Sequence, residues 1–303
     1  MGNKYIKDKY EVFFEKDYII VKNIFDNHYL RLTGKTMNYV IKNINRNDAE
    51  NLLSGIFLCK KFQEKHKIVG VKFKNKYIFQ KIIDYTPNLL LNLPFMISMI
   101  VCSLFLSILT IYLDHNTTDS WLSSLFWIAV NILVHEFGHC LLCIKSGRKI
   151  NSFGIKLNYG IPMVFVDTSD ICMSRLKNKI KTSLGGVYLN SLLCIFAIGA
   201  YWIAKLNMML YSIKIAMFFI LSNLVPFLKL DGYYILSDIL GVTNLDRASK
   251  LTIKNIINLK KIEAREEYIL SIYFILRCLF ILIIFILVVY EMYKFSKNIL
   301  LTI

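Results

Sequence analysis

The sequence shows no signal-peptide pattern, no internal repeat and no low-complexity linker. Its first 85 or so residues are polar and mixed, so we expect no cleaved targeting segment. The seven cysteines are scattered, and most lie in apolar segments, where a free cysteine packs as a small hydrophobic side chain. For Cys140 and Cys143 we favour this packing role over metal binding. The sequence therefore predicts no disulfide framework.

Acidic residues are also scarce, with 21 against 37 basic residues and a net charge of +16. The basic residues gather in three stretches, with 17 in residues 1–89, eight in 145–182 and seven in 229–267, whereas residues 114–120 contain none. The positive-inside rule places these three stretches on the cytoplasmic side of a membrane, together with the N-terminus. The excess positive charge then contacts anionic lipid headgroups, and we expect no nucleic-acid partner.

Hydrophobic residues, in contrast, make up 55% of the chain, and the mean hydropathy is +0.48. These values predict a multi-pass protein of the cell membrane. Five apolar runs are long enough to cross roughly 30 Å of hydrocarbon, at about 94–113, 121–144, 184–204, 208–228 and 268–290. The expected fold is a polytopic α-helical membrane protein with about five spans.

We expect residues 1–85 to form a separate cytosolic α+β domain and residues 86–303 the membrane-embedded domain. The pattern before residue 85 predicts three strands, at 10–14, 18–21 and 27–32. Three helices within 33–66 and a β-hairpin at 68–79 are expected to follow. This winged-helix-like order resembles the peptide-recognition domains that bind leader sequences of ribosomally made peptides. A cap that only stabilises the membrane part is the other interpretation.

The second apolar run contains His135-Glu136-Phe137-Gly138-His139. On a helix the two imidazoles lie one turn apart on one face and can reach one metal ion. Glu136 is rotated away from them, where it can act on a water molecule without being a ligand. Ionisable residues within a hydrocarbon-length segment are costly to insert and indicate a functional site.

A catalytic zinc needs a third protein ligand, and Asp231 is the best candidate. It follows Pro226 at the end of the fourth run and precedes Gly232, where interrupted backbone can line a cavity. The alternative interpretation is that Asp231 only marks the membrane boundary.

The order His-Glu-x-Gly-His followed by Asn-x-x-Pro-x-x-x-Leu-Asp-Gly resembles the site-2 protease family of intramembrane zinc metalloproteases. The resemblance covers residues from about 121 to 240, and the second motif followed by Tyr-Tyr is similar to its branch of peptide zinc metalloproteases. It implies that His135, His139 and Asp231 bind one catalytic Zn²⁺ and that Glu136 is the catalytic base. Members of that branch occur with genes that make and modify small peptides.

The resemblance also points to Asn190 and Asn223 as residues that support the metal site or hold the substrate carbonyl. Joining neighbouring helices is an equally good interpretation of each. The sequence departs from the family pattern at Val187, where a proline is usual, and at Tyr233, where a second glycine is often found. Residues 150–170 alternate enough for a β-hairpin or surface loop, which could hold an extended substrate by strand addition. For Arg277, a structural ion pair or snorkelling is favoured over a role at the site.

These patterns predict a zinc metalloendopeptidase that cleaves a small, ribosomally made peptide, leader-bearing or modified, during its maturation or export. The expected partners are the peptide substrate, the lipid bilayer and either a peptide-modifying enzyme or an exporter. One alternative is regulated intramembrane proteolysis of a membrane-anchored regulator. Another is a non-catalytic peptide receptor or immunity protein that keeps the fold.

Overall fold

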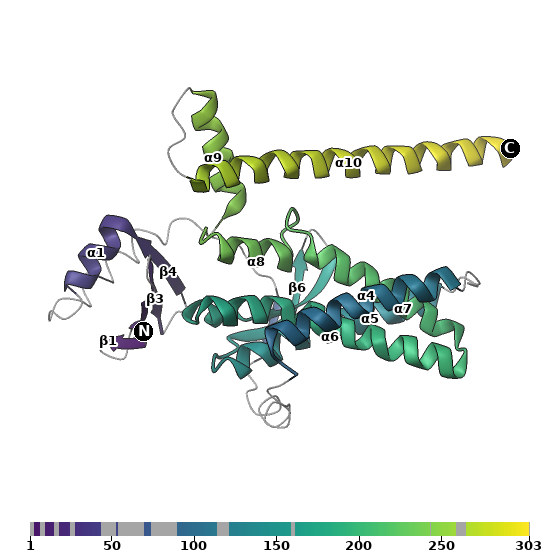
Figure 1. The fold of residues 1–303 in the computed structure, drawn as a ribbon, viewed down its shortest axis with the longest axis horizontal. Helices are drawn as coiled ribbons and strands as arrows, with labels where there is room; N and C mark the ends of the chain where they lie inside the picture. Colours follow the sequence, from purple (N-terminus) through teal and green to yellow (C-terminus); the bar gives the residue numbers. More distant parts are fainter. Residues whose placement is uncertain are drawn as a thin grey trace. The chain divides into compact units, whose positions relative to one another are not determined.

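The computed structural model describes residues 3–6, 10–14, 18–24, 28–43, 53, 70–73, 90–113, 121–158, 161–242, 244–258 and 265–302. These residues form a mostly helical protein with a small N-terminal sheet (Figure 1). They divide into two compact units, Met1–Leu221 and Ser222–Ile303.

The N-terminal sheet is an antiparallel meander in the order β1-β2-β3-β4. Its strands are β1 (Asn3–Ile6), β2 (Tyr10–Phe14), β3 (Tyr18–Asn23) and β4 (His28–Thr33), and α1 (Gly34–Asn43) follows. Alternate residues of β2 and β3 face a core that includes Val12, Ile19 and Val40. The three strands predicted here are confirmed, and β1 was missed because four residues carry too little alternation to be recognised. The predicted second and third helices lie mostly outside the described residues, so the winged-helix arrangement stays a prediction.

A second sheet has the order β5-β6-β7, with β5 at Gly70–Phe73, β6 at Ser152–Asn158 and β7 at Ile161–Asp167. The β6–β7 hairpin confirms the β interpretation of residues 150–170. The sequence predicts that residues 68–73 pair with residues 77–79, but residues 77–79 lie outside the described residues. The described partner of β5 is β6, far away in the chain.

Among the described residues, four helices are long and apolar enough to cross a membrane: α4 (Leu93–Leu113), α5 (Trp121–Lys145), α6 (Leu176–Ala204) and α10 (Arg265–Thr302). α6 packs against both α4 and α5. The predicted fourth span, 208–228, is the shorter apolar helix α7 (Asn207–Leu224). It ends two residues before Pro226 because a proline disfavours helical backbone at the residue before it and cannot donate a backbone hydrogen bond.

A buried ion network ties the N-terminal sheet to the loop after α5. The Arg148 guanidinium donates to both Glu11 carboxylate oxygens, at 2.9 and 3.1 Å, and to Asp170 Oδ2 at 2.8 Å. Asp170 also accepts from Lys22 and, at 3.0 Å, from the Tyr29 hydroxyl. Burial alone would raise the pKa of Asp170, but the hydrogen bonds from Arg148 and Lys22 outweigh it and lower that pKa to about 2. Two acids and two bases therefore cancel in charge.

The unit Ser222–Ile303 contains α8 (Asp231–Ile239), α9 (Leu245–Ile257) and α10. A small apolar core joins them, formed by Tyr233, Leu245, Leu270 and Tyr273. Arg277 Nη1 lies 2.8 Å from Asp246 Oδ1. Of the two roles favoured for Arg277, a structural ion pair and snorkelling, the ion pair is confirmed.

Candidate metal centre

The two motif histidines lie one helical turn apart on α5, and their rings converge. The Nε2 atoms of His135 and His139 are 3.1 Å apart, with the ring planes at 87°. Two nitrogens bound to one tetrahedral zinc at about 2.0–2.1 Å would be separated by roughly 3.3 Å. The spacing of the two imidazoles therefore fits a shared metal ion.

Hydrogen bonds from α6 orient both rings. His139 Nδ1 lies 2.7 Å from the carbonyl oxygen of Thr182. Because a carbonyl only accepts, Nδ1 carries the proton and Nε2 keeps its lone pair for a metal. The Asn190 side chain lies 3.4 Å from His135 Nδ1, and its Oδ1 is buried without a hydrogen-bond partner among the described residues. Turning this amide by 180° puts Oδ1 where it accepts the Nδ1 proton, so that the Nε2 lone pair of His135 can face a metal ion.

Glycines allow α5 and α6 to come this close. A Cβ atom added to Gly138 would lie 2.1 Å from the Gly185 carbonyl oxygen, and one added to Gly185 would lie 2.5 Å from the Gly138 oxygen. A Cβ atom on Gly186 would lie 2.5 Å from His135 Cε1. Any side chain at these positions would separate the helices or displace the ring.

Glu136 is held by the edge strand of the second sheet. Its Oε2 accepts a hydrogen bond of 3.1 Å from the backbone N–H of Val166 on β7. Since Val166 donates to Glu136, this N–H points away from β6, toward the outer edge of the described sheet. The carboxylate and the strand edge are therefore neighbours, as a base and a bound peptide would need to be.

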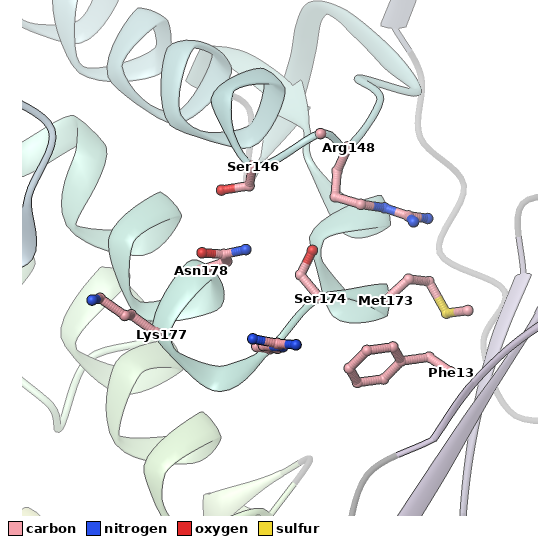
Figure 2. A pocket seen from close by; sticks show the side chains of 9 residues that line it. Phe13, Ser146, Arg148, Met173, Ser174, Lys177 and Asn178 are labelled. Carbon is pink, nitrogen blue, oxygen red and sulfur yellow. The ribbon is translucent and has the colours of Figure 1, made fainter. Parts of the chain in front are cut away.

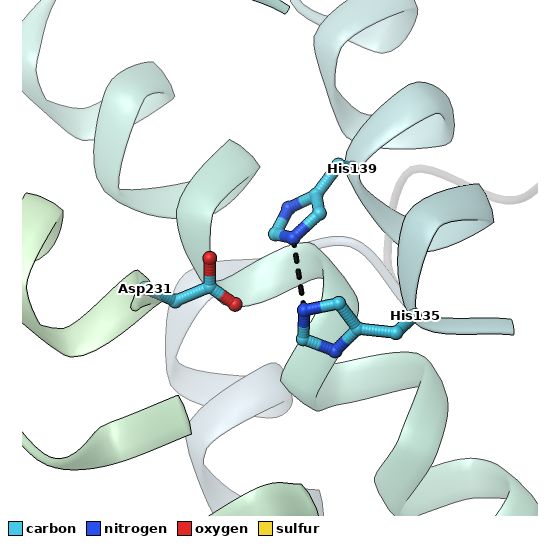
Figure 3. Close-up of side chains that lie close together, drawn as sticks. All are labelled: His135, His139 and Asp231. Atoms are coloured by element: carbon cyan, nitrogen blue, oxygen red, sulfur yellow. Dashed lines mark hydrogen bonds between the residues drawn. The ribbon is translucent and has the colours of Figure 1, made fainter. Parts of the chain in front are cut away.

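Asp231 is the first residue of α8, and Gly232 follows where a Cβ atom would lie 2.3 Å from the Leu224 carbonyl oxygen. Figure 3 shows Asp231 with the two histidines, and the potential ligand atoms of the three residues all lie within 4.8 Å of one another. This group could hold a metal ion, and three is the number of protein ligands that a catalytic zinc takes.

Several residues around the centre were missed by sequence reasoning. Thr182 acts through a backbone carbonyl, which leaves no trace in residue type. Gly186 lies four residues before Asn190 and was noted only as part of a motif. Val166 was placed correctly on a hairpin, but its contact with Glu136 was not predicted. Asn223 is buried in the last turn of α7, and its role stays a prediction.

Comparison with known proteins found one similar curated protein. The chain is 30% identical over 137 residues to the "Putative peptide zinc metalloprotease protein YydH" of Bacillus subtilis (strain 168). The chain is similar to a peptide zinc metalloprotease. The match covers 43% of this chain and 51% of the relative, so the chain spans about half the length of the curated protein it matches. No family model and no solved structure matches.

Proposed function

We propose that this protein is a membrane-embedded zinc metalloprotease that hydrolyses a peptide bond in a small, ribosomally made peptide during its maturation or export. One observation carries the proposal: the Nε2 atoms of His135 and His139 converge to 3.1 Å in a group that includes Asp231. The similarity to a peptide zinc metalloprotease supports the protease activity and the metal. The four helices able to span a membrane support its location there.

His135, His139 and Asp231 would hold the zinc ion. When bound, the ion polarises the scissile carbonyl and lowers the pKa of water. Glu136 accepts the proton of the attacking water and returns it to the leaving nitrogen. The Val166 N–H, 3.1 Å from Glu136 Oε2, keeps this carboxylate in place, and the outer edge of β7 binds the peptide as an added strand.

The peptide substrate and its processing rest on the resemblance of the motifs and on the N-terminal domain. The Glu11–Arg148 ion pair ties β2 of that domain to the loop that follows α5. A peptide held by the sheet would therefore remain near the helix that carries the motif. The basic stretches support a cytoplasmic location for both.

The test compares the wild type with Glu136→Gln, each purified in detergent, and uses the exposed Glu291→Gln on α10 as the matched control. We expect one zinc ion per chain in all three proteins. The peptide encoded beside the gene should be cleaved by the wild type and the control, whereas Glu136→Gln should lose about 100-fold or more of the rate.

Equal cleavage by wild type and Glu136→Gln would refute the assignment of the base. Tight peptide binding with no cleavage by the wild type would instead support a peptide receptor. Cleavage of a membrane-anchored regulator, and not of the small peptide, would support regulated intramembrane proteolysis.

A further inference from the structure

A basic pocket of about 410 Å³ lies at the N-terminal end of α6, where β2, the loop after α5 and the start of α6 meet (Figure 2). Phe13 and Met173 form an apolar side of it, and both are buried. The polar lining residues are Ser146, Arg148, Ser174, Arg175, Lys177 and Asn178. None of the described lining residues is acidic, so the pocket favours an anion.

The charge available to a ligand comes from the first turn of α6. The Arg148 guanidinium is neutralised by Glu11 and Asp170, which leaves its contribution small. Arg175 and Lys177 are both exposed, and neither forms an ion pair with a described residue. Two positive charges therefore remain for a bound group.

A buried hydroxyl also points into this pocket (Figure 2). Ser174 is only 7% exposed, and its hydroxyl forms no hydrogen bond with any described residue. Arg175 is the N-cap of α6, and no side chain caps the first turn. The backbone N–H groups there, the positive end of the helix dipole and the Ser174 hydroxyl are suited to phosphate oxygens.

The position of this helix end in the bilayer narrows the range of ligands that the pocket can bind. At the opposite end of α6, the Trp202 ring lies 4.1 Å from Lys205 Nζ, and Trp202 is about half exposed. Tryptophan and lysine together are typical of a membrane interface. The 27 residues from Leu176 to Trp202 are separated by 26 rises of 1.5 Å and span roughly 39 Å, close to the 40–45 Å of a bilayer with its headgroups. If one end lies in one headgroup layer, the pocket lies in the other.

We propose that this pocket binds the phosphodiester headgroup of an anionic phospholipid. Arg175, Lys177 and the Ser174 hydroxyl contact the phosphate, and the glycerol lies beside the apolar side of the pocket that Phe13 and Met173 form. A basic pocket beside a spanning helix is suited to this class of lipid. Lipid binding at this pocket does not require the protein to be catalytically active.

The experiment uses the full chain in detergent and measures lipid binding by native mass spectrometry. The probes are phosphatidylglycerol, phosphatidylcholine with the same acyl chains, inorganic phosphate and an oligoglutamate peptide. We expect phosphatidylglycerol to bind at least tenfold more tightly than phosphatidylcholine. The double variant Arg175→Gln/Lys177→Gln should weaken the binding of phosphatidylglycerol roughly 25-fold, since each positive charge raises the affinity about fivefold.

Two matched variants control for general charge and for folding. Lys250→Gln/Lys254→Gln removes two charges from α9 and should leave the affinity within about twofold. Arg175→Lys/Lys177→Arg keeps the charges and should retain binding. Ser174→Ala should weaken binding about tenfold or more through loss of one hydrogen bond to a charged group.

Equal binding of the two lipids, or an equal loss in the α9 control, would overturn the proposal. Binding of inorganic phosphate without any preference for phosphatidylglycerol would show a soluble anion site instead. Displacement of phosphatidylglycerol by oligoglutamate, with the peptide the tighter ligand, would assign the pocket to an acidic peptide.

Discussion

Gly186→Ala tests whether α6 shapes the metal centre. The added Cβ atom would lie 2.5 Å from His135 Cε1 and 2.6 Å from Nδ1 and Nε2. Carbon atoms in proteins do not approach closer than about 3.0–3.4 Å, so the ring must move by roughly 0.5–0.9 Å. A zinc ligand tolerates about 0.2 Å.

We expect Gly186→Ala to weaken zinc binding about 100-fold, measured by competition with a chelator of known affinity. The imidazole is a side chain that can rotate away, so the melting temperature of the metal-free protein should change little. Gly138→Ala should behave differently, because its Cβ atom would lie 2.1 Å from the Gly185 backbone oxygen. Forcing the two helices apart should cost about 1–3 kcal/mol and lower both stability and zinc affinity.

Gly199→Ala on the same helix is the control, because a Cβ atom there would meet nothing within 4 Å. It should bind zinc normally and be stabilised by up to about 1 kcal/mol, since alanine favours a helix more than glycine does. If Gly186→Ala bound zinc as tightly as Gly199→Ala, the close contact between His135 and α6 would be refuted.

Three other predictions concern the ligand, the base and the ion network. Asp231→Ala should weaken zinc binding by about 100-fold or more, since it removes a ligand. Asp238→Ala, seven residues later on α8, should not weaken it. Equal zinc content in both variants by elemental analysis would exclude Asp231 as a zinc ligand. Val166→Pro removes the N–H that holds the motif carboxylate, so the cleavage rate should fall roughly tenfold at unchanged zinc content, and an unchanged rate would show that this hydrogen bond has no role. Asp170→Asn should cost about 3–5 kcal/mol in denaturant unfolding because it leaves Arg148 and its neighbours with excess buried charge. The pKa of Asp170 is lowered from 3.8 to about 2, so its contribution is complete above pH 4 and is lost as the pH falls toward 2; stability that did not fall over that range in the wild type relative to Asp170→Asn would contradict the network.

The parts of the fold that could be predicted are those that depend on local periodicity. The predicted apolar runs 94–113 and 121–144 agree with α4 and α5 to within one residue. They could be predicted because burial in a bilayer needs only length and hydrophobicity. The strands β2, β3 and β4 show enough alternation to be recognised. β1 does not, because it depends on its pairing with β2.

The part of the site that could be predicted is equally local. His135 and His139 face the same way because four residues make slightly more than one helical turn, whatever the rest of the chain does. For Arg277 the sequence favoured an ion pair or snorkelling but could not name the acidic partner. Its partner, Asp246, comes from another helix, and any of several acidic residues could have filled that role.

The sequence by itself determined the apolar segments of α4 and α5 and the His-Glu-x-x-His face, since both follow from the residues along one helix. Only the tertiary structure decided how that face is supported. Thr182 orients His139 through a backbone carbonyl, and Gly186 makes room for His135 through the lack of a side chain. Arg148 finds Glu11 across 137 positions of sequence. Contacts of this kind depend on which surfaces pack together, and local spacing carries no record of that.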